Sequence, residues 1–293
     1  MAINLGSGAI SNIKIGDNQA YKVYKGSDVV WDSGVSPTPV AIKALKFESS
    51  GAQTLGVDAT KLGTIIPNFE YSRDNGATWT TWNVADALGF GNGTSLYIRG
   101  SNTFLAKGGD NYTRFVFGTS EPVACSGNIM HLFDYTQDLT SFPDDSSNSS
   151  RGVKYMFYHA DVLTTPPSLP ANVLPAYAYY YMFALCSSLT IPPALPAMNV
   201  PTSAYQSMFQ LCNSLDAIPA LPATSIGSMG YGAMFAQCSK IKMSETQTGE
   251  YQNRYEFGSI PGGYGTNMFS ETGGTFTGRP DQTTYYTANT IIS

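Results

Sequence analysis

The sequence predicts a multidomain α+β protein whose larger part is a solenoid of 26-residue repeats. Three observations predict this fold class. A Met-Phe pair recurs at a spacing of 26 residues, short segments of alternating apolar residues precede the repeats, and only 13% of the 293 residues are charged. Charged residues usually make up about a quarter of a globular domain. We expect four parts, namely a short N-terminal β segment (1–34), a small β-sandwich (41–122), the repeats (129–270) and a C-terminal cap or tail (271–293).

The repeat is defined by a Met-Phe pair that is followed, in three of four copies, by a Cys. The copies are Met156-Phe157, Met182-Phe183 with Cys186, Met208-Phe209 with Cys212, and Met234-Phe235 with Cys238. A degenerate copy is expected earlier, at Phe133 and Leu139, and a last copy later, at Met268 and Phe269 after an insertion of eight residues. A period that is fixed over four copies indicates a stacked repeat architecture.

Each copy is expected to contain a short α-helix. The apolar face of one copy is Tyr205, Met208, Phe209 and Cys212. The spacing i, i+3, i+4, i+7 is typical of one helix face about two turns long. The prolines that follow favour a short extended edge with Leu195 or Leu221 pointing inward. A two-turn helix is unstable alone, so we expect neighbouring copies to stabilise one another by stacking.

The cysteines Cys186, Cys212 and Cys238 should form a row along the stack. We interpret them as small buried hydrophobic residues. A zinc site usually needs closely spaced ligand pairs such as C-x-x-C, and the sequence has none. Four cysteines in 293 residues are also too sparse for a disulfide framework. We therefore expect no metal and no cofactor.

The N-terminal segment 1–34 contains two related halves, with Gly16 and Gly26 ten residues apart. Alternating apolar residues, such as Ile13 and Ile15, predict short strands joined by Gly-Asp and Gly-Ser turns. This segment is too small to bury a core alone, so we expect it to pair with a partner or with copies of itself. Residues 35–40, "VSPTPV", are interpreted as a linker.

The β-sandwich is predicted from three strand candidates, "AIKALKFES", "TSLYIRG" and "YTRFVFGT". The stretch "SRDNGATW", from Ser72 to Trp79, resembles the Asp-box, a hairpin turn of sialidases and other β-propellers. We interpret Asp74 and Gly76 as turn-formers and Trp79 as a packing residue. A glycan-binding role for Trp79 or Trp82 is the alternative.

The sequence favours a protein that is not an enzyme. The two histidines, His131 and His159, have no partner at ligand spacing, and no nucleophile elbow or phosphate-binding loop is present. The net charge of −5 without a basic run argues against nucleic-acid binding. No run of 18 apolar residues predicts a membrane span. The N-terminus lacks the features of a secretory signal, so we expect synthesis in a cytoplasm.

The repeat pattern "YxxMFxxCxSLxxxPxLPA" resembles the BspA-type leucine-rich repeat of bacterial surface proteins. Together with "YSRDNGATW" and "ACSGNIM" it is similar to proteins of Bacteroidetes and of the tailed, crAss-like phages that infect them. The opening "IKIGDNQAYKVYKGSDVVW" is similar to short segments that dock phage fibre and decoration proteins onto a virion.

This resemblance implies a virion structural protein, either a head fibre or a capsid decoration protein. It would be made in the host cytoplasm, dock to capsid or tail proteins through residues 1–34, and form a homotrimer. A tail fibre or other receptor-binding protein of the phage, and a bacterial surface adhesin, are the alternatives. Tyr177, Tyr180 and Tyr181 would then stack on host glycans, or else cover the stack or meet a neighbouring subunit.

Overall fold

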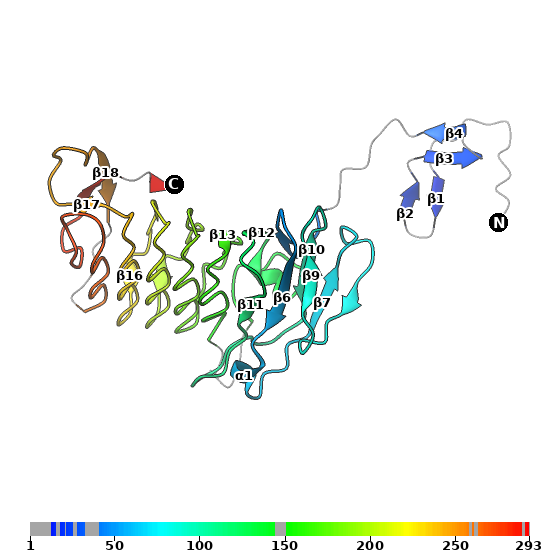
Figure 1. Cartoon of the computed structure of the whole chain (residues 1–293), viewed down its shortest axis with the longest axis horizontal. Coiled ribbons are helices and arrows are strands. Elements are labelled where there is room, and N and C mark those ends of the chain that lie inside the picture. The colour runs from blue at the N-terminus through cyan, green and yellow to red at the C-terminus, as the bar shows by residue number, and fades with distance from the viewer. Residues whose placement is uncertain are drawn as a thin grey trace. The chain divides into compact units, whose positions relative to one another are not determined.

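The computed structural model is mostly β-structure and divides into two compact units, Met1–Ile42 and Lys43–Ser293 (Figure 1). The structure describes residues 41–143, 151–257, 260 and 263–288 in full. It also describes the backbone of five strands, at 13–15, 18–20, 22–25, 28–32 and 291–292.

The N-terminal unit contains two β-hairpins. Its strands are β1 (Ile13–Ile15), β2 (Asn18–Ala20), β3 (Lys22–Lys25) and β4 (Asp28–Asp32). Strand β1 pairs antiparallel with β2, and β3 pairs antiparallel with β4 through an irregular register. The short strands predicted here are therefore confirmed. The two Gly-containing connections and the linker 35–40 lie outside the described residues.

The first part of the larger unit is built from two sheets, and residues 43–126 are named the two-sheet region. Its elements are β5 (Leu45–Glu48), β6 (Gln53–Val57), α1 (Ala59–Leu62), β7 (Phe69–Ser72), β8 (Thr80–Thr81), β9 (Leu88–Phe90), β10 (Leu96–Gly100), β11 (Phe115–Phe117) and β12 (Val123–Ser126). The larger sheet has the order β13-β12-β5-β10-β7-β8, and the smaller has the order β11-β6-β9. Phe47 on β5 lies 6.4 Å from Phe90 and 5.9 Å from Phe115 (ring centroids), so the side chains between the two sheets form a core.

The second part carries the sequence repeats, and residues 151–271 are named the ladder region. After η1 (Ile129–Leu132), the named elements are β13 (Leu163–Thr165), β14 (Asn199–Val200), β15 (Ile218–Pro219), β16 (Ser225–Ile226), β17 (Met243–Ser244) and β18 (Asn253–Glu256). Most of each copy consists of consecutive turns, and the copies lie side by side in Figure 1.

Alternate backbone amides join one copy to the next. The amide of Phe157 donates to the carbonyl of Met182 (3.0 Å), that of Phe183 to Met208 (2.9 Å), and that of Phe209 to Met234 (2.9 Å). The amides in between fold back within the copy, as when Met182 donates to the carbonyl of Tyr179 (3.1 Å). This pattern gives the described amides in the centre of each copy a backbone partner.

The predicted α-helices are wrong. Every fourth residue of each copy has positive φ, for example Tyr177 (62°), Tyr181 (53°) and Leu185 (64°). An α-helix cannot contain such residues, and it would direct its amides along its own axis rather than to a neighbour. Each copy is instead a ribbon of consecutive turns, named the turn ribbon, with a period of four residues. Its inward-facing residues recur at i and i+4 and at i+3 and i+7, which are also the spacings of one helix face. The apolar pattern therefore matched a helix face.

The residues predicted to form the repeat core are all buried. Their exposed fraction is 0% at Met156, Phe157, Met182, Phe183, Cys186, Met208, Phe209, Cys212, Met234, Phe235 and Cys238. Leu195 and Leu221 also point inward, at 3% and 8% exposed, and Met268 and Phe269 of the last copy are at 0%. The apolar pattern thus identified the buried residues although it gave the wrong backbone conformation.

The two-sheet region and the repeats, for which the sequence predicts the ranges 41–122 and 129–270, lie in one compact unit. Strand β13 adds to the larger sheet in parallel beside β12, and Phe47 lies 6.4 Å from Phe157 (ring centroids). The C-terminal residues also belong to this unit. There β19 (Thr284–Thr287) pairs with β17 and β18, and β20 (Ile291–Ile292) pairs with β15.

Candidate functional site

A group of tyrosines, all partly exposed except the buried Tyr112, lies where the two-sheet region meets the first repeat copies. We name it the tyrosine cluster, and it comprises Tyr112, Tyr155, Tyr158, Tyr177, Tyr180 and Tyr181. The last three were predicted from the sequence, and the structure brings them together with the other three.

Tyr155 is the centre of the tyrosine cluster. Its ring stacks on Tyr112 (4.6 Å, interplanar angle 24°) and on Tyr181 (5.3 Å, 20°), and it meets Tyr180 edge to face (5.4 Å, 83°). Tyr177 in turn meets Tyr180 at 5.6 Å and 76°. Both stacked and edge-to-face contacts are favourable for aromatic rings. The rings therefore hold one another in place while parts of them face solvent.

The backbone beneath these rings is fixed on both sides. The amide of Tyr155 donates to the carbonyl of Tyr180 (2.9 Å), and the amide of Arg151 donates to Ala106 in the two-sheet region (3.0 Å). Tyr155, Tyr177 and Tyr181 all have positive φ. Tyr155 and Tyr181 occupy the same position in successive copies and share this conformation, so their side chains leave the backbone on the same side. Residues 26 apart thus present rings on a common surface.

Cationic side chains surround the tyrosine cluster. Lys154 lies 5.8 Å from the ring centre of Tyr112, and Arg151 lies 5.5 Å from that of Tyr177. The ammonium group of Lys154 donates to the carbonyl of Gly109 (2.5 Å), and only 6% of this residue is exposed. Cations near ring faces at these distances are attracted by the ring quadrupole.

Burial perturbs the ionisation of the groups in this region. It raises the pKa of Tyr155 and of Tyr180, because the phenolate form would lose hydration. Burial lowers the pKa of Lys154, and the nearby carboxylate of Asp110 partly opposes that shift. The phenol hydroxyls therefore stay protonated at neutral pH and can donate hydrogen bonds.

These side chains line a pocket of about 340 Å³. One wall comes from the loop of Gly108, Gly109 and Asp110, and the other comes from the ladder region. The ladder wall consists of Arg151, Lys154, Tyr155, Tyr177 and Tyr180. Aromatic walls with a few placed polar groups are typical of ligand sites. We name it the tyrosine pocket.

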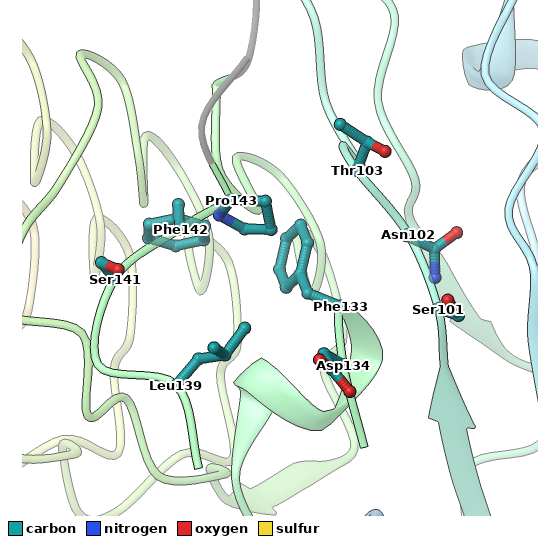
Figure 2. A pocket seen from close by; sticks show the side chains of 9 residues that line it. All are labelled: Ser101, Asn102, Thr103, Phe133, Asp134, Leu139, Ser141, Phe142 and Pro143. Carbon is teal, nitrogen blue, oxygen red and sulfur yellow. The ribbon is translucent and has the colours of Figure 1, made fainter. Parts of the chain in front are cut away.

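A larger hollow of about 480 Å³ lies between the loop of Ser101, Asn102 and Thr103 and the segment from Phe133 to Pro143 (Figure 2). The amide nitrogen of Asn102 already donates to the carbonyl of Leu132 (2.6 Å). The carboxylate of Asp134 accepts from the backbone and hydroxyl of Thr136 (2.8 and 2.6 Å). These polar groups thus already form hydrogen bonds within the protein, which makes this hollow a weaker candidate site.

Trp82, a predicted binding residue, is part of the core. It is 3% exposed, stacks on Phe69 (5.8 Å, 29°), and donates its indole N–H to the carbonyl of Asp86 (2.9 Å). No ring face of Trp82 is open to a glycan, so the alternative that Trp82 binds one is not supported. The sequence did not predict that Trp82 is buried, because a Trp beside a turn gives the same residue pattern whether its side chain points into the core or toward solvent.

The Asp-box stretch forms the predicted turn between β7 and β8. The carboxylate of Asp74 accepts from the hydroxyl of Ser72 (2.6 Å), the amide of Thr78 (2.9 Å) and the hydroxyl of Thr78 (2.5 Å). These hydrogen bonds lower the pKa of Asp74 to about 2. Trp79 lies under the guanidinium of Arg99, 3.9 Å from the ring centre, so it packs as predicted while remaining partly exposed.

The two histidines lie apart from the tyrosine cluster. His131 is 6% exposed and its Nε2 is 2.9 Å from a carboxylate oxygen of Asp138, which also bonds Lys43. His159 is largely exposed, with Nδ1 3.2 Å from Asp161. Within the described part of the chain, no three His, Cys, Asp or Glu side chains are placed to hold a metal ion.

The repeat cysteines form the predicted row, and each thiol donates to the backbone carbonyl of the Phe in the preceding copy. The Sγ–O distances are 3.1 Å from Cys186 to Phe157, 3.0 Å from Cys212 to Phe183 and 2.9 Å from Cys238 to Phe209. Burial raises the pKa of all three thiols, that of Cys238 to about 12. The described cysteines are free thiols that are poor nucleophiles at neutral pH.

Comparisons of this chain with protein-family models, with curated proteins and with solved structures gave no match. No helix among the described residues has the length and hydropathy to cross a bilayer.

Sequence reasoning missed half of the tyrosine cluster and both cations of its pocket. Tyr112 and Tyr155 are 43 residues apart, and no local spacing links them. One signal was available, because Tyr155 precedes Met156 in the first copy as Tyr181 precedes Met182 in the second. The alignment of copies at a period of 26 predicts that these two rings stack.

Proposed function

We propose that this chain is a structural protein of a phage virion, either a head fibre or a capsid decoration protein. Residues 1–34 would dock onto capsid or tail proteins, and three copies would assemble into a homotrimer. The larger unit would be presented at the virion surface for attachment to the host surface or its glycans. Its repeats would form a leucine-rich-repeat-like solenoid of the BspA type.

The observation that carries this proposal is the backbone ladder, which holds partly exposed tyrosines in register. The amides of Tyr155, Tyr177 and Tyr181 each donate to the neighbouring copy, at 2.9, 3.0 and 3.1 Å. Side chains fixed in this way lose little conformational entropy on binding. A rigid aromatic surface of this kind suits attachment better than catalysis, which needs acid, base or nucleophile groups within reach of one another.

The division into two units supports the docking role of the N-terminus. The strands of the two N-terminal hairpins are three to five residues long, and a single small hairpin is marginally stable alone. Pairing with a partner or with other copies would stabilise them. This argument applies equally to a tail fibre, and less directly to a bacterial adhesin.

Immunogold electron microscopy tests the proposal. An antibody against residues 43–293 is applied to purified phage particles and to uninfected host cells. We expect label on the capsid. Label on the tail would favour the tail-fibre alternative, and label confined to cell envelopes would overturn the virion proposal in favour of an adhesin. Light scattering of the purified chain tests the trimer, whose mass should be three times that of one chain.

A further inference from the structure

A long stretch of the ladder region carries almost no charge. The chain has 21 acidic and 16 basic residues, and Asp216 is the only one of them between residues 162 and 239. Neither histidine lies in this stretch. Charged residues usually make up about a quarter of a globular domain, and most of them are exposed. The surface of these copies therefore lacks the charged groups that usually cover a protein.

The same stretch exposes large apolar side chains. Val173 is 64% exposed and Met198 is 52% exposed. Position 173 is equivalent to Asn199 of the next copy, 26 residues later, and Asn199 directly follows Met198. The amide of Tyr177 donates to the carbonyl of Thr202 (3.0 Å), which holds the two copies in this register. Val173 and Met198 therefore occupy adjoining positions on neighbouring copies.

Prolines extend this apolar surface over three copies. Pro170, Pro196 and Pro222 occupy one position at the spacing of 26 residues, and each is exposed or partly exposed. Pro196 and Met198 flank the buried Ala197, so their side chains leave the extended chain on the same side. We name this surface the proline face, and it comprises Pro170, Val173, Pro196, Met198 and Pro222.

The chemistry of the proline face favours contact with protein rather than with a glycan or an ion. Its five side chains offer no charge and no aromatic ring, and its prolines have no backbone N–H, so a saccharide or an anion finds few groups that bind it. Depletion of charged residues instead distinguishes the core of a protein interface, and interfaces between identical subunits are the more apolar ones. The proline face therefore has the features of a subunit interface.

A second copy of this chain is the partner that the charge distribution favours. Each copy carries a net charge of −5, so two copies repel one another where their charged surfaces meet. Across the proline face, two copies meet without like charges in opposition. A different protein would be selected through complementary charges, and the proline face has none to offer.

We propose that the proline face is the surface through which copies of this chain associate. Val173 and Met198 would be buried at the centre of the contact, and the three prolines would surround them. This inference deepens the homotrimer proposed above and rests on it, because it names the surface at which the copies meet. An assembly held together through the N-terminal unit alone is the arrangement that opposes it.

Sedimentation equilibrium of the full chain tests the inference with a pair of matched variants. Met198→Lys places a charge in the proline face, whereas Ile66→Lys places the same charge at a residue of the two-sheet region that is 89% exposed. We expect Met198→Lys to weaken association by about a hundredfold or more, because the lysines of two copies would meet without a counter-charge. Ile66→Lys changes the net charge equally and should not weaken association.

The outcomes separate the proline face from the proposed function. A wild-type chain that stays monomeric up to about 0.1 mM would overturn this inference and the homotrimer, and immunogold labelling would still decide the virion proposal. An assembly that survives Met198→Lys, or that both variants weaken equally, would reject the proline face alone. Assembly that only Met198→Lys abolishes, without label on particles, would support the proline face and reject the virion proposal.

A cross-linking variant keeps the inference testable if Met198→Lys does not fold. All four cysteines of the chain are buried, so Met198→Cys introduces an exposed thiol where the chain has none. Where two proline faces meet, mild oxidation with copper phenanthroline should join two of these thiols in a disulfide. We expect a covalent dimer on a non-reducing gel from Met198→Cys and none from Ile66→Cys. An assembled Met198→Cys chain that does not cross-link would overturn the inference.

Discussion

The two-sheet region and the ladder region bury aromatic rings in different ways. In the two-sheet region Phe47 meets Phe90 at 59° and Phe115 at 85°, so each ring has its own geometry. In the ladder region Phe157, Phe183, Phe209, Phe235 and Phe269 form one row, with interplanar angles of 5–14° and centroid spacings of 5.5–5.7 Å. A second row, of Tyr179, Tyr205 and Tyr231, is equally regular.

The difference follows from how each core is assembled. Two sheets that pack face to face bring unlike positions together, and side chains interdigitate as their shapes allow. A ladder brings the same position of successive copies together, so identical side chains stack on themselves. A substitution in the ladder therefore changes one member of a row, and both of its neighbours respond.

The largest expected effect is at the centre of the Phe row. Phe209→Ala should lower the free energy of unfolding by about 3–5 kcal/mol, because Phe209 is fully buried and stacked on both sides. Chemical denaturation measures this loss. Ile191→Ala, at a residue that is 52% exposed, should cost about 0.5 kcal/mol or less. A loss below about 1 kcal/mol for Phe209→Ala would show that the Phe row does not stabilise the ladder.

A substitution in the Tyr row should have the opposite effect and raise the free energy of unfolding. The buried hydroxyl of Tyr205 has no hydrogen-bond partner among the described residues. A buried, unpaired polar group costs about 1–3 kcal/mol, so Tyr205→Phe should raise the free energy of unfolding by up to about 1 kcal/mol. Tyr255→Phe is the matched control, because the Tyr255 hydroxyl donates to the carbonyl of Pro219, and it should lower stability by about 1 kcal/mol. Losses of equal size in the two variants would mean that Tyr205 is paired.

A smaller effect distinguishes the turn ribbon from a helix. Ala233 has a φ of +51°, a conformation in which Gly is not penalised. Ala233→Gly should therefore leave stability unchanged or raise it by up to about 1 kcal/mol, whereas the same change inside an α-helix costs about 1 kcal/mol. Ala236→Gly, at a buried residue of the same copy that has no positive φ, should lower stability by about 1 kcal/mol. Thermal denaturation of both variants checks the difference, and equal losses would favour a helix.

The smallest expected effect lies in the two-sheet region, at the Asp-box turn. Hydrogen bonds from Ser72 and Thr78 lower the pKa of Asp74 from 3.8 to about 2. The turn is therefore stabilised by the carboxylate above pH 3.8, and this contribution is lost as the pH falls toward 2. Carbon-13 NMR should give a midpoint near pH 2 for Asp74. A midpoint near the ordinary value would mean that these hydrogen bonds do not form, and Asp74→Asn should remove the transition.

The sequence by itself determined the period, the buried positions and the turn at Asp74. Copies of Met, Phe and Cys at a spacing of 26 were sufficient to predict which side chains stack, because apolar residues at fixed intervals must share a core. The strands in residues 13–32 and around Phe47, Ile98 and Val116 were also predictable, since their apolar residues alternate.

Only the tertiary structure decided the backbone of the repeats and the position of the candidate site. Residues such as Tyr181, Leu185 and Ser207 adopt positive φ without being Gly or Asn, so no local signal marks them. That conformation costs about 1–2 kcal/mol per residue, and it is stabilised by hydrogen bonds and rings of neighbouring copies. The tyrosine pocket likewise joins Asp110 to Arg151 and Tyr177 across the boundary of two regions. Contacts between residues so far apart in the chain exist only once it has folded.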